Sequence, residues 1–460
     1  MGWPCTADRS SFASMKHATH FLRFLGSIIL VTSAVTASAQ TISAGGQHSL
    51  AVCYDGTAMA CGNNGNGQFG NGAQLGSFTL TPINGLTGVQ AVATGGSHSM
   101  ALDDQGIVWT MGRGDNGQIG NGSAANQLVP FAAFDSALVI AASNTSSYAL
   151  KSDSTVWGWG YNFYGQLGNG AGGDMWSPVE ALTITDAVDI AAGGLSVFAL
   201  RADSTVLAWG YNNYGQLGNG NTTNQAVPVP VVGLTGVVDI ACGTEVAMAL
   251  KSDGTVWTWG RNDGGLLGNG TTTSSNVPVQ VQGLTDVVSI AAGDWNFAAV
   301  RSDSTVWTWG SSAGNAASQV AGIDQVVEVS VFQHWWALRA DATMWTWGSN
   351  INGQQGTGDQ WPRSAPVEVI GNCDLNASVN ERSSDNVIQA TPNPMVDHST
   401  IRSTRTIRSF ELFDAVGRMV SNGSVNASSF ILERGNLPSG MYHLIVRAEG
   451  GSTSMRLVVP

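Results

Sequence analysis

Short apolar runs alternate with glycine-rich polar segments along most of this chain. In residues 237–281 each run has the length of a β-strand, and tight turns separate the runs. The tryptophans of Val256–Gly260 are two residues apart, so they lie on one face of a strand. The last run contains Pro278, which removes a backbone donor and favours an edge position. The strands predicted in this unit are 237–243, 247–250, 256–260 and 277–281.

The unit repeats seven times. A phrase related to Val-Trp-Thr-Trp-Gly ends at Gly62, Gly112, Gly160, Gly210, Gly260, Gly310 and Gly348. Successive glycines are 50, 48, 50, 50, 50 and 38 residues apart, so only the sixth unit is short. Four-stranded antiparallel units that close radially leave only short, protected strand edges. We therefore predict an all-β fold whose main part is a seven-bladed β-propeller at residues 41–370, with a long loop missing from blade 6.

Phrases within the unit resemble the repeat of the regulator of chromosome condensation family. Ala44–Val52 reads Ala-Gly-Gly-Gln-His-Ser-Leu-Ala-Val, and Thr94–Leu102 keeps its Gly-Gly-x-His-Ser-x-Ala core. Gly254–Gly260 and the Gly-Gln-Leu-Gly-Asn-Gly loop at 215–220 look like other parts of that repeat. The resemblance covers about residues 41 to 370. It implies the propeller fold and a habit of binding macromolecules, but no single activity.

Two roles of that family fit this chain poorly. The founding member is a nuclear exchange factor for a small GTPase and also contacts chromatin. This chain has a formal net charge of −13 and only three lysines, Lys16, Lys151 and Lys251. So few cations cannot neutralise many phosphates, which disfavours nucleic acids and anionic membranes as partners. Secreted bacterial members fit better, and one of them inhibits β-lactamases by covering their active sites with a propeller face.

Residues 1–40 have the order of an N-terminal extension and a secretory signal peptide. A basic segment from Met15 to Arg23 precedes the apolar run 24–35, and Ala37-Ser38-Ala39-Gln40 has the small-x-small cleavage pattern. The apolar run is too short for a typical transmembrane helix. We expect translation to start at Met15, cleavage near Gln40, and no transmembrane anchor.

A second domain is predicted after a polar linker at 371–386. Residues 387–460 alternate with the strand period, which favours a small β-sandwich. Three of its phrases resemble the C-terminal sorting domain of the type IX (Por) secretion system. That resemblance implies export by the type IX machinery, removal of the domain, and release or attachment at the cell surface. The phrases are Pro392–Pro394, Leu412–Arg418 and Leu437–Tyr442.

The sequence offers no catalytic, cofactor or metal-binding constellation. His48, His98 and His334 share one repeat position in three separate blades, and the family pattern makes them structural. Asp153 and its counterparts stand in hairpin turns, where Asp accepts backbone hydrogen bonds. No lysine follows the loop Asn66–Gly72, so that loop is not a phosphate loop. We expect a protein that is not an enzyme, with no cofactor and no metal.

The five cysteines are odd in number and have no recurring spacing. If Asp55-Gly56 is a two-residue turn, Cys53 lies opposite Ala58, and Cys61 is three residues further on. An odd offset places two side chains on opposite faces of a sheet. We predict no disulfide between Cys53 and Cys61, and we interpret the cysteines as small buried hydrophobic residues.

The fold restricts where a partner can bind. In an antiparallel four-stranded blade the first and third turns lie on one rim, and the hairpin turn and the blade-to-blade link lie on the opposite rim. The second rim is monotonous in sequence, whereas the first varies. Tyr, Trp and Arg on loops of a rigid scaffold are enriched in binding hot spots, although they could also be scattered exposed residues. The candidate residues on the first rim are Trp295, Gln333, His334, Trp335, Glu245, Arg113, Tyr161, Tyr211 and Arg261.

Blade 6 is the first place to look for a site. Its loop after Gly310 shortens to Ser311–Asn315, which predicts a notch in the variable rim. We expect Trp295 beside this notch, with Gln333, His334 and Trp335 at the start of blade 7. The alternative is that Trp295 simply covers the gap.

These features favour a secreted or cell-surface propeller that binds macromolecules as a protein-interaction or adhesion module. Its partner would be an unidentified extracellular protein or glycan. Two alternatives remain, an inhibitor of an extracellular enzyme and a carbohydrate-binding protein, the latter because of the aromatic residues on the rim.

Overall fold

The computed structural model describes residues 41–53, 55–311, 313–370, 388–391, 398–414, 419–435, 437, 440–448 and 451–459. The predicted signal peptide at 1–40, the linker at 371–386 and the phrase Pro392–Pro394 lie outside these residues. The described part is all-β, as predicted, and contains no helix long and apolar enough to cross a membrane.

Between Ile42 and Glu368 the strands form seven sheets of four consecutive strands each. The first strands are β1 (Ile42–Ala44), β5 (Val89–Thr94), β9 (Ala137–Ala142), β13 (Ala187–Gly193), β17 (Val237–Cys242), β21 (Val287–Ala292) and β25 (Val326–Val331). The second strands are β2 (His48–Val52), β6 (His98–Asp103), β10 (Ser146–Lys151), β14 (Ser196–Arg201), β18 (Val246–Lys251), β22 (Asn296–Arg301) and β26 (His334–Arg339). The third strands are β3 (Ala58–Gly62), β7 (Val108–Gly112), β11 (Val156–Gly160), β15 (Val206–Gly210), β19 (Val256–Gly260), β23 (Val306–Gly310) and β27 (Met344–Gly348). The fourth strands are β4 (Ser77–Pro82), β8 (Gln127–Phe134), β12 (Met175–Glu180), β16 (Gln225–Pro230), β20 (Ser275–Gln280), β24 (Gly314–Gln319) and β28 (Arg363–Glu368).

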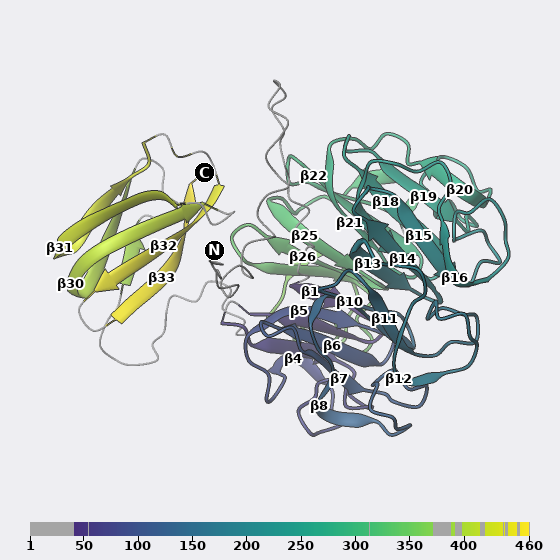
Figure 1. The fold of residues 1–460 in the computed structure, drawn as a ribbon. Helices are drawn as coiled ribbons and strands as arrows, with labels where there is room; N and C mark the ends of the chain where they lie inside the picture. Colours follow the sequence, from purple (N-terminus) through teal and green to yellow (C-terminus); the bar gives the residue numbers. More distant parts are fainter. Residues whose placement is uncertain are drawn as a thin grey trace, which may run out of the picture. The chain divides into compact units, whose positions relative to one another are not determined.

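These sheets are the blades of a closed propeller (Figure 1). The first strands contact one another in succession from β1 to β25, and β25 contacts β1, so they line the central axis. The predicted seven blades are confirmed, and all third strands end at the predicted glycines. The short sixth unit is also confirmed, because only residues 311–313 separate β23 from β24, whereas 261–274 separate β19 from β20.

Tryptophans of the third strands join neighbouring blades. The second tryptophan of the phrase is fully buried in blades 3 to 6. Its indole N–H donates to a backbone carbonyl in the preceding blade's loop, as Trp259 does to Gln216 over 2.9 Å. The first tryptophan is half-buried beneath a cation of the second strand, as Trp257 is beneath Lys251 at 5.6 Å. The equivalent indole bonds run from Trp159 to Gln118, Trp209 to Gln166 and Trp309 to Leu266.

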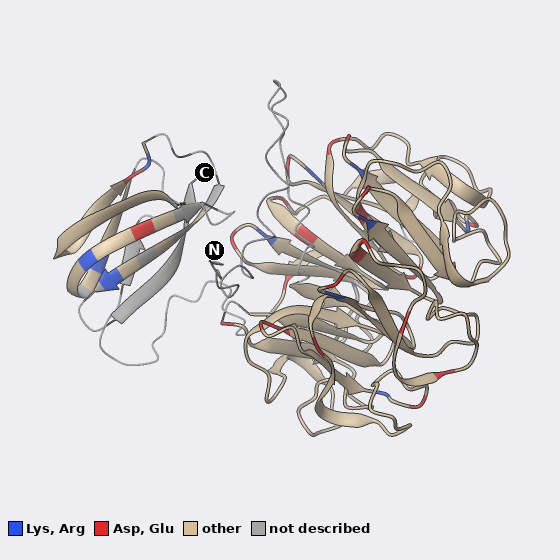
Figure 2. Ribbon diagram, viewed as in Figure 1, with Lys and Arg blue, Asp and Glu red and all other residues tan. Residues whose placement is uncertain are grey.

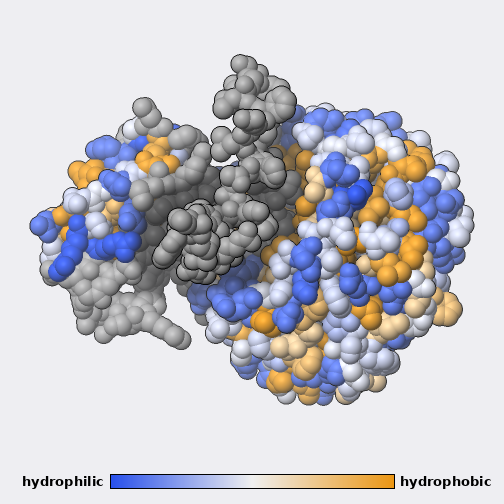
Figure 3. Space-filling view, viewed as in Figure 1, coloured by the Kyte–Doolittle hydropathy of each residue, from blue (hydrophilic) through white to orange (hydrophobic). Residues whose placement is uncertain are grey.

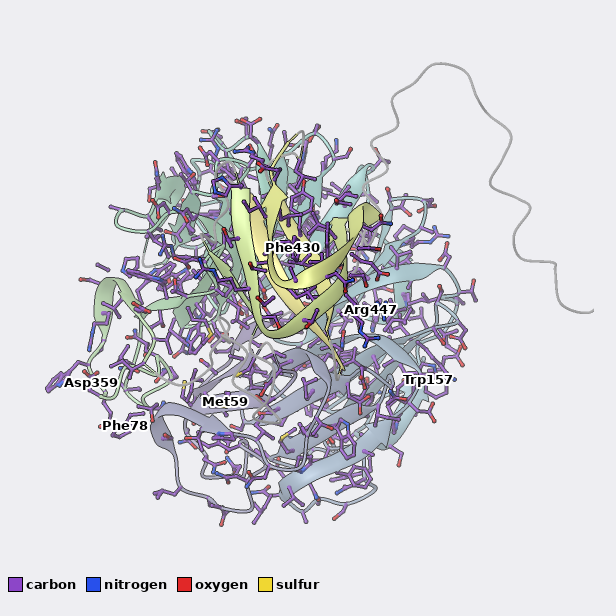
Figure 4. All side chains as sticks on the ribbon, turned by 90° about the vertical axis from the view of Figure 1, so that its left-hand side faces the viewer. Met59, Phe78, Trp157, Asp359, Phe430 and Arg447 are labelled. Atoms are coloured by element: carbon purple, nitrogen blue, oxygen red, sulfur yellow. The ribbon has the colours of Figure 1, made fainter. Side chains whose placement is uncertain are left out.

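The ring closes between blade 7 and blade 1. The half-buried carboxylate of Glu328 on β25 accepts hydrogen bonds from the backbone N–H groups of Thr41 and Ile42, over 3.0 and 3.3 Å. At the outer edge, Gly358 N–H of blade 7 donates to the carbonyl oxygen of Phe78 on β4 over 2.8 Å. Phe78 and Asp359, which follows Gly358, lie close together in Figure 4. Blades 1 and 7 each consist of their own four consecutive strands, so no strand is shared between them. Side-chain and backbone hydrogen bonds therefore join the two blades where the ring closes.

The three repeat histidines hold neighbouring blades together. The His48 Nε2 lies 2.8 Å from the Ser99 Oγ, and that hydroxyl donates to the Gln68 carbonyl oxygen over 2.8 Å. Because the Ser99 hydroxyl proton is used in the bond to Gln68, the Ser99 oxygen must accept from His48, and His48 Nε2 therefore carries the ring proton. His98 with Ser147 and His334 with Ser49 repeat the arrangement. Burial lowers the pKa of His48 and His334 to about 3 and of His98 to about 4, which keeps all three rings neutral.

The C-terminal strands are β29 (Ile388–Thr391), β30 (His398–Asp414), β31 (Met419–Glu433), β32 (Gly440–Ala448) and β33 (Gly451–Val459). They belong to one connected sheet in the order β29-β30-β32-β33, with β31 paired to β30, rather than to two separate sheets. One end of the long β30 pairs with β29 and its other end with β32, so this single strand connects β29 to the rest of the sheet. Phe410 and Phe430, the latter labelled in Figure 4, stack with ring centroids 4.6 Å apart.

The cysteines follow the sequence prediction in part. Cys61 is free and buried, so the predicted absence of a Cys53–Cys61 disulfide is confirmed. The predicted register is wrong by one residue, because Val52, not Cys53, pairs with Ala58. Cys53 is disulfide-bonded, which corrects its interpretation as a small hydrophobic residue.

Candidate binding surface

One backbone hydrogen bond in every blade joins the two variable positions of the first rim. The residue after the third strand donates its N–H to the carbonyl oxygen of the first turn, as Arg261 does to Glu245 over 2.9 Å. The preceding glycine makes this approach possible. Gly260 has a φ of +107°, and a Cβ there would lie 2.3 Å from the Glu245 carbonyl oxygen. The other donor and acceptor pairs are Asn63 and Gln47, Arg113 and Ser97, Tyr161 and Thr145, Tyr211 and Leu195, Ser311 and Trp295, and Ser349 and Gln333.

Seven of the nine candidate residues reach the surface. Arg113 and Gln333 are exposed, and the half-buried ones are Trp295, Glu245, Tyr161, Tyr211 and Arg261. The other two candidates, His334 and Trp335, are buried, with exposed fractions of 0% and 6%. They are therefore unavailable to a partner, and the prediction that they border an open notch is wrong.

Trp335 is buried because it fills the space left by the missing loop of blade 6. In blade 5, a Cβ at Gly260 would lie 3.1 Å from the Gln216 side chain in the preceding blade's loop. Blade 6 has no such loop, and a Cβ at the equivalent Gly348 would instead lie 2.8 Å from the Trp335 ring. Trp335 also stacks on Trp347, with ring centroids 5.9 Å apart and an interplanar angle of 4°. The shortened unit is thus repacked from within.

Arg261 connects three blades on this rim. Its guanidinium lies between two aromatic rings, 4.9 Å from the centroid of Tyr214 in blade 4 and 4.9 Å from that of Trp295 in blade 6. The same group forms ion pairs with Glu245 and Asp263, each at 2.8 Å. These hydrogen bonds raise the pKa of Arg261 further, so the cation is permanent. Such a locked arginine holds Trp295 in a fixed position.

The aromatic side chains continue from Arg261 into blades 4 and 3. Tyr164 meets Tyr211 edge-on with ring centroids 4.9 Å apart, and Phe163 meets Tyr164 edge-on at 5.1 Å. Tyr161 stacks on Phe163 at 6.5 Å. Phe163 is the most accessible of these residues, with 70% of its surface exposed. We call Tyr161, Phe163, Tyr164, Tyr211, Tyr214 and Trp295 the aromatic rim.

Sequence reasoning missed Phe163, Tyr164 and Tyr214, because the phrase that contains them is part of the repeated loop. That loop is held from inside by a buried asparagine. In blade 4 the Asn212 Oδ1 accepts the Leu217 N–H over 2.9 Å, and its Nδ2 donates to loop carbonyls. The available signal was the pair of tyrosines that flank this asparagine in two adjacent blades, Tyr161 with Tyr164 and Tyr211 with Tyr214.

Carboxylates border the aromatic rim. Burial raises the pKa of the Tyr211 hydroxyl, and the nearby Glu245 raises it further. Burial also raises the pKa of Tyr161, with Tyr164 and Asp174 as further contributors. Figure 2 shows that charged residues are sparse along the propeller, and Figure 3 shows small hydrophobic and hydrophilic patches interspersed on the face in view. The surface combines fixed aromatic rings with negative charge.

A second contact links the first turns of blades 5, 6 and 7. The Gln333 side-chain amide donates to the Asp294 carboxylate over 3.1 Å, and the Thr244 hydroxyl donates to the same carboxylate. Trp295 follows Asp294, so its turn is held from both sides. Within the described residues, no group of three His, Cys, Asp or Glu side chains could hold a metal ion.

The strands define a seven-bladed propeller, followed by a further β-sheet at the C-terminal end of the chain. Residues 40–329 match the family model of the RCC1-like domain, and the chain belongs to that family. Residues 390–460 match the model of the secretion system C-terminal sorting domain. This Por-type tail assigns export by the type IX machinery to the cell surface or the medium. No curated protein matches the sequence.

Three solved structures show the same fold. Human WBSCR16 is 20% identical with a TM-score of 0.59, over 64% of this chain and 85% of that one. Prp20p from Saccharomyces cerevisiae, whose structure was reported with its binding to Gsp1p and histones, is 19% identical with a TM-score of 0.60, over 77% and 89%. Yeast RCC1 (Prp20) bound to Kap60 is 18% identical with a TM-score of 0.61, over 84% and 93%. At such identities the likeness concerns the fold alone.

Proposed function

We propose that this exported propeller is a non-catalytic binding module that recognises an extracellular protein through the aromatic rim. The observation that carries the proposal is the gathering of aromatic rings on one rim in two groups. Edge-to-face contacts hold the rings from Phe163 to Tyr211 in blades 3 and 4, and Arg261 holds Tyr214 and Trp295. Tyrosine and tryptophan supply large contact areas and dominate protein-binding hot spots. Because these side chains are already fixed, little conformational freedom is lost on binding.

The alternatives drawn from the sequence concern the same surface. An inhibitor of an extracellular enzyme would also be a protein-binding module, and it would lower hydrolase activity when added to culture supernatant. A carbohydrate-binding protein would use the exposed ring faces, of which Phe163 is the most accessible. If the full chain bound sugars on a glycan array, the result would favour the carbohydrate-binding hypothesis over the protein-binding one.

Replacing Trp295 with alanine should weaken binding of the captured partner by about tenfold or more, because the variant removes a fixed aromatic contact and uncovers Arg261. The partner is first isolated by crosslinking to the full chain in the surrounding medium, and its Kd is then measured for wild type and variant. Ser252→Ala, in a hairpin turn of the opposite rim, is the matched control. Equal affinities for both variants at unchanged thermal stability would exclude the rim as the site.

Export should remove both ends of the chain. We expect the mature protein to start near Gln40 and to lack the sorting domain, because Por-type tails direct export. Intact-mass and peptide mass spectrometry of the secreted protein measure both ends. Recovery of a mature protein that still contains the C-terminal peptide Val458-Val459-Pro460 would contradict processing of the sorting domain.

A further inference from the structure

The contacts of Arg261 show how this surface holds a cationic group. Two aromatic faces enclose its guanidinium, and two carboxylates accept its hydrogen bonds. Aromatic faces attract cations through their quadrupole, and carboxylates add charge-assisted hydrogen bonds. Arg261 is thus an intramolecular example of a ligand that the rim can accept.

The neighbouring part of the rim has the same ingredients without an internal cation. Blades 3 and 4 carry Tyr161 and Tyr211 at the repeat position that Arg261 occupies in blade 5. Asp174 lies near Tyr161, and Glu245 lies near Tyr211. With Phe163 largely exposed, aromatic faces are available there to a group from outside. Asp174 accepts the Asn162 N–H over 3.2 Å and Glu245 pairs with Arg261, and each carboxylate has further lone pairs for another donor.

The charge of the propeller points in the same direction. Residues 41–370 contain 23 acidic and 8 basic residues, an excess of 15 negative charges. All six arginines in this range form ion pairs. Arg113 in blade 2, for example, pairs with Asp115 at 2.6 Å. No described cation of the rim is left for an anionic ligand. A neutral glycan would also use the ring faces and would donate hydroxyl hydrogen bonds to carboxylates, but it carries no positive charge to balance this negative excess.

We propose that the protein partner of the aromatic rim presents lysine or arginine side chains, which lie on the accessible ring faces of blades 3 and 4 and bond the bordering carboxylates. This inference rests on the proposed function and names the chemistry of its partner. Both aromatic contact and charge contribute, so binding depends on salt but is not a general attraction between opposite charges.

The test uses the full chain and three labelled peptides of equal length, in which Arg, Lys or Gln alternates with Gly and Ser. Fluorescence anisotropy measures the Kd at low and moderate salt. We expect the Arg and Lys peptides to bind about tenfold or more tightly than the Gln peptide, with affinity falling as salt rises. Tyr164→Ala should remove most of this difference, with circular dichroism confirming that the variant is folded.

Two charge-matched variants separate a site from general electrostatics. Asp174→Asn removes a carboxylate that borders Tyr161 in blade 3 and keeps an oxygen that accepts the Asn162 N–H, whereas Asp104→Asn removes an exposed carboxylate from a hairpin turn on the opposite rim. We expect weaker binding of the Arg peptide only in the first. Equal affinities for the Arg and Gln peptides, equal losses in both variants, or binding of neutral oligosaccharides alone would overturn the inference. A captured partner that still needs Trp295 would leave the proposed function standing while the cationic partner is rejected.

Discussion

Replacing Trp259 with alanine should lower the free energy of unfolding by about 3–5 kcal/mol, the usual cost of truncating a fully buried aromatic side chain. Trp259 is 0% exposed and packs between blades 4 and 5, where its ring lies edge-on to Phe198 with centroids 5.9 Å apart. The variant also leaves the Gln216 carbonyl without the indole donor that lies 2.9 Å away. Chemical denaturation followed by tryptophan fluorescence and circular dichroism measures the loss.

A second tryptophan provides the matched control. Trp361, in the long loop of blade 7, has 74% of its surface exposed. Its replacement by alanine should change the free energy of unfolding by about 0.5 kcal/mol or less. If both variants unfold at the same denaturant concentration, the third-strand tryptophans do not hold the blades together and our account of the core is wrong.

The repeat made the fold predictable from sequence. Each third strand ends at a glycine with a strongly positive φ, and in blades 1 to 6 the first-turn carbonyl oxygen occupies the place of a Cβ, as at Gly260. A requirement of that kind leaves the same residue at the same position in every unit. Antiparallel order then sufficed to place the two variable turns on one rim, where Arg261 and Glu245 are joined by a backbone hydrogen bond.

Contacts between blades were not predictable in the same way. Trp335 occupies a position where blades 1 to 3 have serine, and only the packing between blades shows that its ring replaces the missing loop of blade 6. The position of Arg261 between Tyr214 and Trp295 likewise depends on contacts among three blades. A repeat pattern gives the residues of a single blade and not the contacts between blades. The repeated sequence pattern determines the fold of each blade. The sizes of the side chains between neighbouring blades determine which rim residues remain exposed.

Two half-buried carboxylates on the innermost strands have a predictable effect on stability. Asp189 on β13 and Asp239 on β17 occupy the same position in adjacent blades. Burial raises the pKa of Asp189 to about 6, and burial with the neighbouring Asp189 charge raises the pKa of Asp239 to about 8. In the unfolded chain both carboxyls titrate near pH 3.9. Between those values the folded protein holds a proton that the unfolded chain has released, so stability falls as the pH rises.

Asp239→Asn should therefore stabilise the protein in a pH-dependent manner. The asparagine keeps an oxygen that can accept the Ile240 and Ile290 N–H groups but has no charge to bury. Relative to wild type, the gain should be small near pH 4 and grow as the pH rises, by at most about 1.4 kcal/mol per pH unit for one proton. It should level off above pH 8, where Asp239 is ionised in both states.

Asp189→Asn is the companion variant, because without its charge the Asp239 pKa falls and the levelling-off moves to lower pH. Denaturation curves between pH 4 and 9 measure these differences, and a gain for Asp239→Asn that is constant over that range would show that the carboxyl is ionised in the folded protein throughout.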